Sequence, residues 1–191
     1  LSVAQVEAIE TQDIAVLTSA QAAALTTEQV AALTTEQIGS LGTRALVALN
    51  SAQLAVLSTS DILALGAAQV AALRTAQIAA LSPEQVAAFE TQDMAVLNTA
   101  QVQALSTAQI AAFSSEQLAH LTPSAVASLS TLQLGAFAAE DIAGLTSPQV
   151  AALRTAQVAA LTTTQVAALE TNDLAVLTGA QLAALGTAQI A

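Results

Sequence analysis

The stretch Leu25-Thr-Thr-Glu-Gln-Val-Ala-Ala-Leu-Thr-Thr-Glu-Gln-Ile-Gly-Ser40 contains two copies of one eight-residue pattern, and the whole chain repeats it. A large apolar residue opens each octad at every eighth position from Leu1 to Leu185, without an insertion or deletion. Twenty-four octads, the last lacking one residue, account for all 191 residues. Because no linker interrupts the pattern, we predict a single repeat array over residues 1–191, forming part of a longer protein or assembly.

Position five of the octad carries a second, longer pattern. Glutamine occupies it in every odd-numbered octad: Gln5, Gln21, Gln37, Gln53, Gln69, Gln85, Gln101, Gln117, Gln133, Gln149, Gln165 and Gln181. In even-numbered octads the order is Asp, Gln, Ala, Asp, Gln, and it starts again every ten octads, at Asp13, Asp93 and Asp173. The alternation predicts a sixteen-residue structural unit. The 80-residue super-repeat indicates either duplication of a gene block or one superhelical turn.

Each octad carries the signals that start an α-helix. Ser, Thr, Asn or Gly usually stands at position two as a helix cap, and Gln or Asp three residues later completes a capping box. The apolar residues at positions one and six have the spacing of a hydrophobic staple. A continuous helix is excluded because eight residues overshoot two turns by about 80°, so the apolar side chains would spiral around the axis. Alanine and glutamine also disfavour a β-solenoid.

We therefore predict an all-α solenoid with one very short helix in each octad. Helices of about six residues are unstable alone, so neighbouring coils must hold them. Two helices in each sixteen-residue coil would stack about twelve coils into a rod with continuous apolar ladders. Phe89, Phe113 and Phe137 occupy position one of octads that are three octads apart. They would alternate between the two sides of such a coil, so we expect core fillers and no single aromatic face.

Composition restricts the classes of function. Fourteen acidic and three basic residues give a net charge of −11, which leaves almost no donors for phosphate contacts with a nucleic acid. Ser, Thr and Gln interrupt every apolar run, so no membrane insertion is predicted. The chain has no cysteine and one histidine, His120, which we interpret as a surface residue. We expect no metal, no cofactor, no catalytic residue and no enzymatic activity.

Two sets of residues are candidates for a functional role. The glutamines of odd-numbered octads either cap their helices and join adjacent coils, or present a file of amides to a carbohydrate, ice or a crystalline surface. The second set contains charged residues at position two of even-numbered octads, which a sixteen-residue coil would place on one face: Glu10, Arg74, Glu90, Arg154 and Glu170. That face is a candidate contact for a protein or glycan.

The octads Leu25-Thr-Thr-Glu-Gln-Val-Ala-Ala32, Leu105-Ser-Thr-Ala-Gln-Ile-Ala-Ala112 and Leu153-Arg-Thr-Ala-Gln-Val-Ala-Ala160 resemble tracts of very large repetitive bacterial surface or secreted proteins that are often described as adhesin-like. The resemblance covers the whole chain, and it implies an extracellular or cell-surface location and a passive, extended role. Leu81-Ser-Pro-Glu-Gln-Val-Ala-Ala88 is similar to the opening of a TAL-effector repeat. That match ends after one helix start, because the period here is eight or sixteen residues.

From these observations we expect a structural protein, namely a rigid surface fibre, filament subunit or stalk built by stacking of repeat coils. Neither end shows a distinct polar capping octad, which predicts end-to-end self-association. The alternative is an adhesive module that contacts a protein, a glycan or another surface through one face of the solenoid.

Overall fold

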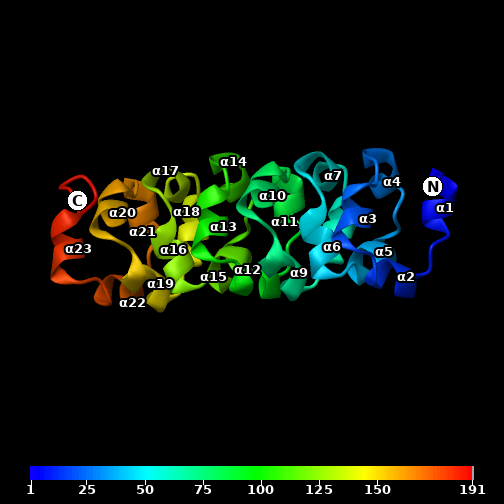
Figure 1. Cartoon of the computed structure of the whole chain (residues 1–191). Helices are drawn as coiled ribbons and strands as arrows, with labels where there is room; N and C mark the ends of the chain where they lie inside the picture. The colour runs from blue at the N-terminus through cyan, green and yellow to red at the C-terminus, as the bar shows by residue number, and fades with distance from the viewer. Residues whose placement is uncertain (191) are drawn as a thin grey trace. The chain divides into compact units, whose positions relative to one another are not determined.

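The computed structural model describes residues 1–190, and within them it contains helices but no strand. Each of the first 23 octads forms one helix, and the helix labels follow the octad numbers (Figure 1). The helices of residues 1–96 are α1 Val3–Glu7, α2 Thr11–Ala15, α3 Ser19–Ala23, α4 Thr27–Ala31, α5 Thr35–Ser40, α6 Thr43–Ala48, α7 Ser51–Ala55, α8 Thr59–Leu63, α9 Ala67–Ala72, α10 Thr75–Ala80, α11 Pro83–Ala87 and α12 Thr91–Val96. The later helices are α13 Thr99–Ala104, α14 Thr107–Ile110, α15 Ser115–His120, α16 Pro123–Ser128, α17 Thr131–Leu134, α18 Ala139–Ala143, α19 Ser147–Ala152, α20 Thr155–Ala160, α21 Thr163–Ala168, α22 Thr171–Ala175 and α23 Gly179–Ala184. The predicted all-α class with one very short helix in each octad is confirmed.

Contacts between Cα atoms divide the chain into two compact units. Unit 1 is Leu1–Val96 and contains α1–α12, and unit 2 begins at Leu97 with α13. Within each unit, helices pack against those three octads away along the chain. In unit 1, α2 packs against α5, α5 against α8 and α8 against α11; in unit 2 the same order joins α14, α17, α20 and α23. We call such a set of stacked helices a column.

One coil of the solenoid therefore contains three helices, one from each of three successive octads, so the twelve helices of unit 1 form four coils. The solenoid is confirmed, but the predicted sixteen-residue coil with two helices, and the twelve coils that it implied, are wrong. The physical reason lies in the corners between helices. At the corner after α6, Leu49 has ψ 138° and Asn50 has ψ 171°, so two extended residues separate successive helices. Such a corner turns the chain without reversing it, and three corners are needed to close a coil.

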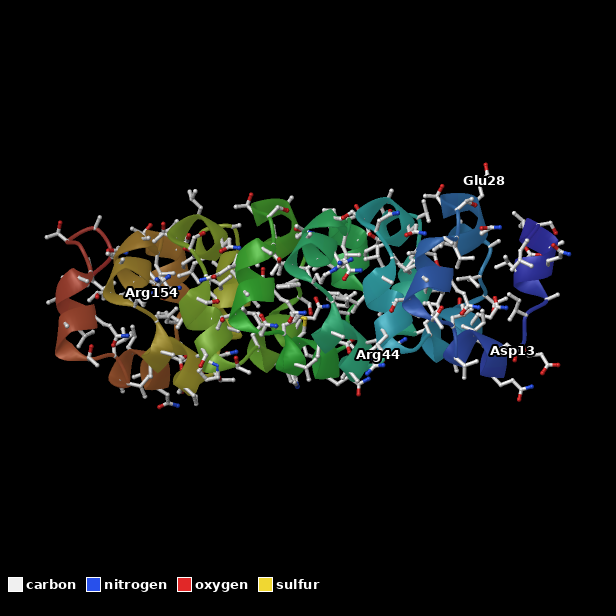
Figure 2. All side chains as sticks on the ribbon, in the orientation of Figure 1. Asp13, Glu28, Arg44 and Arg154 are labelled. Carbon is white, nitrogen blue, oxygen red and sulfur yellow. The ribbon has the colours of Figure 1, made fainter. Side chains whose placement is uncertain are left out.

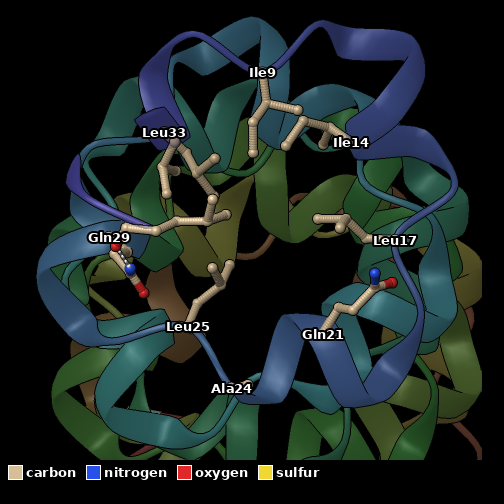
Figure 3. A pocket seen from close by; sticks show the side chains of 10 residues that line it. Ile9, Ile14, Leu17, Gln21, Ala24, Leu25, Gln29 and Leu33 are labelled. Carbon is tan, nitrogen blue, oxygen red and sulfur yellow. Dashed lines mark hydrogen bonds between the residues drawn. The ribbon is translucent and has the colours of Figure 1, made fainter. Parts of the chain in front are cut away.

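The core of each unit consists of the side chains at positions one, five and six. Ile78 and Leu118, at position six, are completely buried. Figure 3 shows Ile9, Leu17 and Leu25, at position one of successive octads, pointing towards the middle of the ring formed by the first helices. Because the staple spacing brings positions one and six to the same side of every short helix, stacking of coils buries them together.

The polar side chains at positions two to four face outwards. Glu28, at position four of its octad, is exposed and points away from the ribbon (Figure 2). Thr27 and Thr35, at position three, are exposed as well. The outer surface is therefore built mainly from hydroxyl groups, alanine methyl groups and scattered charges.

The three phenylalanines lie in the core, each with 3% of its surface exposed, as expected. In unit 2, the rings of Phe113 and Phe137 stack with their centroids 6.4 Å apart and their planes at 28°. These two residues open octads that are one coil apart, so they belong to one column. The expectation that phenylalanines at this spacing alternate between sides was wrong, because it depended on the sixteen-residue coil.

Candidate functional site: the glutamine links between coils

The glutamine at position five closes the start of its own helix. In α17, the Ser130 backbone N–H donates to Gln133 Oε1 over 2.9 Å, and the Gln133 backbone N–H donates to Ser130 Oγ over 3.1 Å. This reciprocal capping box satisfies two of the N–H groups that a helix start leaves without an intrahelical partner. The same arrangement, with Asn50 and Gln53, begins α7.

The amide nitrogen of the same side chain reaches the preceding coil. Gln133 Nε2 donates to the carbonyl oxygens of Val102 and Leu105 over 3.1 and 2.7 Å, and Gln85 Nε2 donates to those of Leu54 and Leu57 over 3.1 and 2.7 Å. The acceptors lie 31 and 28 residues earlier, at the end of a helix and in the corner that follows it. We call this two-sided arrangement a glutamine link.

The glutamine link pairs backbone groups that very short helices leave without hydrogen-bond partners. A helix of five or six residues leaves most of its backbone N–H and C=O groups without partners inside the helix. A primary amide offers both donors and acceptors, so one side chain pairs with N–H groups of its own helix and with C=O groups of the coil beneath. Gln157 is completely buried, and Gln53 and Gln77 are 1% exposed, so each link is formed away from water, where an unpaired polar group is costly.

Most of the predicted glutamine set forms links, but the set was too narrow. Links to the preceding coil are formed by Gln37, Gln53, Gln69, Gln85, Gln133, Gln149, Gln165 and Gln181. Gln5, Gln21, Gln101 and Gln117 also form capping boxes at the starts of their own helices. Glutamines of even-numbered octads form the same link as well, among them Gln29, Gln77, Gln157 and Gln189. Their position in the octad was the available signal, and the sixteen-residue coil obscured it by assigning odd and even octads to different surroundings.

Aspartate at position five provides only part of the link. Asp61 Oδ2 accepts hydrogen bonds from the backbone N–H and the hydroxyl of Ser58, over 2.9 and 2.7 Å. This carboxylate therefore caps α8 as glutamine caps other helices. An ionised carboxylate has no donor, so it cannot pair with the carbonyl groups of the preceding coil.

The charged residues at position two do not share one side of a unit. In unit 1, Glu10, Arg74 and Glu90 stand at the starts of α2, α10 and α12, which belong to three different columns. In unit 2, Arg154 and Glu170 precede α20 and α22, which again belong to different columns. The single face that the sixteen-residue coil implied is therefore not formed within either unit.

The two arginines of this set contact the same carbonyl groups as the neighbouring glutamines. Arg154 Nη2 donates to the Leu129 carbonyl oxygen over 2.7 Å, and Gln157 Nε2 donates to the same oxygen over 2.9 Å. Arg74 Nη2 contacts the Leu49 oxygen at 3.3 Å in the same way. These guanidinium groups therefore supplement glutamine links in place of a hydroxyl cap.

His120 and Glu84 lie on the surface. His120 is exposed at the end of α15, with Nδ1 2.9 Å from the carbonyl oxygen of Glu116. The hydroxyl of Ser82 lowers the pKa of the exposed Glu84 carboxyl by hydrogen bonding. Among residues 1–190, no group of three or more His, Cys, Asp or Glu side chains could hold a metal ion. In the same residues, no helix has the length and apolar character needed to cross a bilayer.

A family model described as the ALTTAQ repeat matches residues 6–43, 55–89, 86–123, 139–171 and 166–191. The chain belongs to the ALTTAQ repeat family. The six letters run from position eight of one octad to position five of the next, as in Ala32-Leu-Thr-Thr-Glu-Gln37. The ALTTAQ repeat thus contains the corner leucine, the capping hydroxyl and the linking glutamine, and the tandem repeat predicted from the octads is confirmed. A search among curated proteins finds no match to the chain.

Proposed function

We propose that this ALTTAQ repeat protein is a structural element, a fibre, filament subunit or stalk that extends by adding coils, and that it has no catalytic role. The glutamine link is the observation that carries this proposal. It is made almost entirely of backbone groups and one repeated side chain, so a coil joins any other coil of the same kind. The resemblance to tracts of bacterial surface proteins supports a position outside the cell or on its surface.

The first coil of unit 1 presents the donor side of the glutamine link, which is the amide group that would contact a preceding coil. A hollow of about 270 Å³ is lined mainly by apolar side chains, among them Leu1, Ile14 and Leu25 (Figure 3). Gln21 lies at its edge and caps α3, and no earlier coil of the described chain lies beneath it. This surface offers an amide donor and apolar side chains, which are the groups that a preceding coil would cover.

The last described coil of unit 2 presents the acceptor side of the link, which consists of backbone carbonyl groups beside apolar side chains. Leu182 and Ile190 are 46% and 67% exposed and line an apolar hollow together with Leu169 and Leu185. If a second copy continued the octad count, its Gln21 would come 31 and 28 positions after Leu182 and Leu185 of the first copy. These are the separations between Gln133 and its two acceptors, Val102 and Leu105. A head-to-tail contact in this register would therefore form a normal glutamine link, and such contacts propagate into filaments when they do not close into rings.

Sedimentation and negative-stain electron microscopy of the 191-residue chain over a concentration series test this proposal. We expect particle length to increase with concentration, and we expect Leu182→Glu to keep the chain monomeric. Leu132→Glu is the matched control, because Leu132 is 76% exposed on α17, away from the proposed contact, and assembly should persist. A parent chain that remains monomeric at every concentration would overturn the proposal.

A second candidate function is an adhesive module for a protein or glycan. It is favoured by a groove in unit 2 at which the exposed side chains of Leu132 and Arg154 meet Gln103, Ser106 and Ser130. This groove combines a guanidinium group, hydroxyl groups and an apolar side chain. Attachment of the chain to glycan arrays and protein-coated surfaces should fall with Leu132→Ala and with Arg154→Ser. Equal attachment of folded variants and parent would exclude the groove.

A further inference from the structure

The aspartates at position five reveal what replaces the missing amide donor. Asp61 Oδ1 accepts a hydrogen bond from Thr35 Oγ1 over 2.9 Å, and Asp173 Oδ1 accepts one from Ser147 Oγ over 2.8 Å. In both pairs the hydroxyl residue lies 26 residues earlier, at position three of the helix beneath. A hydroxyl group of the preceding coil therefore completes the contact that glutamine makes with its own Nε2.

Asp93 lacks this partner. The residue at the corresponding place beneath it is Ala67, the first residue of α9, on which α12 stacks. Asp93 has 0% of its surface exposed, and its Oδ2 accepts the Glu90 backbone N–H over 2.9 Å. Among the described residues, its Oδ1 is the only buried side-chain nitrogen or oxygen atom without a hydrogen-bond partner. A buried oxygen of an ionised carboxylate in this state is strongly unfavourable.

Protonation of Asp93 at Oδ1 removes both the buried charge and the unpaired acceptor. The neutral carboxyl group carries no charge and gains an O–H donor, as a glutamine amide has an N–H donor. Glutamine links end on carbonyl groups at two fixed places in the preceding coil, such as those of Leu54 and Leu57 for Gln85. For position 93 the equivalent carbonyl groups are those of Ile62 and Leu65. The protonated side chain therefore resembles glutamine in its hydrogen-bonding capacity, whereas the ionised one does not.

We propose that Asp93 makes the contact between α9 and α12 a pH-sensitive joint in the last coil of unit 1, firm when the carboxyl group is protonated and weak when it is ionised. The charged surroundings favour this behaviour. Burial raises the pKa of Asp93, the Glu90 carboxylate raises it further, and the hydrogen bond from the Glu90 backbone opposes both. The helix beneath, α9, carries no titratable residue. The adjacent helix α11 carries Glu84.

The direction of the pH effect follows from linkage. Because the pKa of Asp93 is higher in the folded chain than its ordinary value of about 3.9, its stabilising effect is complete below that ordinary value. The effect is lost as pH rises through the raised pKa. Between the two values, the equilibrium constant for opening α12 should increase about tenfold for each pH unit.

Hydrogen exchange of the full chain between pH 4 and pH 8, read by mass spectrometry and corrected for intrinsic exchange rates, tests the joint. We expect the protection of α12 amides to fall as pH rises, relative to that of α8, in which Thr35 contacts Asp61. Ala67→Ser restores the missing hydroxyl, and serine already occupies position three at Ser51 and Ser147. This variant should remove most of the pH dependence, and Asp93→Asn should remove it as well.

Thr35→Ala is the matched control variant, because it should create the same defect beneath Asp61 and give α8 a new loss of protection with rising pH. Comparison of each variant with the parent cancels the contributions of the other titratable groups. A pH dependence of α12 that Ala67→Ser and Asp93→Asn both leave unchanged would overturn the proposal. Protection of α12 that does not vary with pH in the parent would do the same.

Discussion

Phe113 and Phe137 stack ring on ring in unit 2, three octads apart in the chain and 6.4 Å apart between their centroids. Their spacing of three octads is the length of one coil. Both rings occupy position one, where leucine is the usual residue and packs against the core.

Replacement of both phenylalanines tests the stacking. Stacked aromatic pairs contribute about 0.5–1.5 kcal/mol beyond the area that they bury. We therefore expect Phe113→Leu and Phe137→Leu to show a coupling of this size in a double-mutant cycle measured by urea unfolding. A control cycle that pairs Phe113→Leu with Leu177→Val, in another column, should show no coupling. An uncoupled phenylalanine pair would contradict the stacking.

Removal of one glutamine link should destabilise the solenoid strongly. Gln157→Leu keeps the volume of the side chain but leaves the Arg154 N–H and the Val126 carbonyl without their amide partner in a buried environment. We expect a loss of about 2–4 kcal/mol in the free energy of unfolding, measured by urea titration. Gln5→Ala removes only an exposed cap, so its loss should stay below about 1 kcal/mol. Similar losses for the two variants would contradict the importance of the contact between coils.

Gly144 permits a close approach between two helices of unit 2. A Cβ atom at this position would lie 2.9 Å from Ser115 Cβ and 3.3 Å from the Ser115 carbonyl oxygen. We expect Gly144→Ala to lower the melting temperature, with a cost of about 1–3 kcal/mol from overpacking between α15 and α18. Gly179→Ala is the control, because a methyl group added there would have no neighbour within 4 Å and alanine favours the helix. It should leave the melting temperature unchanged or raise it.

Arg154 can be replaced by the residue that stands one coil earlier in the same column. Ser130 caps α17 through its hydroxyl group, and Arg154 stands at the corresponding position before α20. Arg154→Ser should therefore change the free energy of unfolding by less than about 0.5 kcal/mol, since a new cap offsets the lost contact with Leu129. A loss of more than about 1.5 kcal/mol, beyond what one cap accounts for, would show that the guanidinium group holds the coils together. Stability close to that of the parent makes the variant a suitable probe of the groove beside Leu132.

The local structure could be predicted from the sequence because its causes are local. Ser130 and Gln133 are three residues apart, and a capping box at that spacing is formed within one helix whatever surrounds it. The closure of the coil depends on the angle of each corner, which the octad pattern does not express. Gln133 shows the consequence. It was correctly placed among the glutamines that cap helices and join coils, but its partners Val102 and Leu105 could be named only once the coil length was known.

The shared face predicted for the charged residues at position two is not formed, for a related reason. Glu10 and Glu90 are ten octads apart, which is three coils and one further octad. A super-repeat of that length moves each copy of a residue to the next column. The missing hydrogen-bond partner of Asp93 could not be predicted either. Only the coil length shows that Ala67, and not a Ser or Thr, lies beneath this carboxylate.

The three-helix coil also has a mechanical consequence. The three octads of one coil, pulled straight, span about 80 Å, whereas the coil occupies about 8–10 Å along a stack of helices. Because nearly every coil is held by the same few amide contacts, tension on a unit would peel coils off singly at similar forces. Each event would release most of the extended length of one coil. The force–extension curve of a stretched chain would therefore show steps of uniform length, and each step would dissipate part of the applied load.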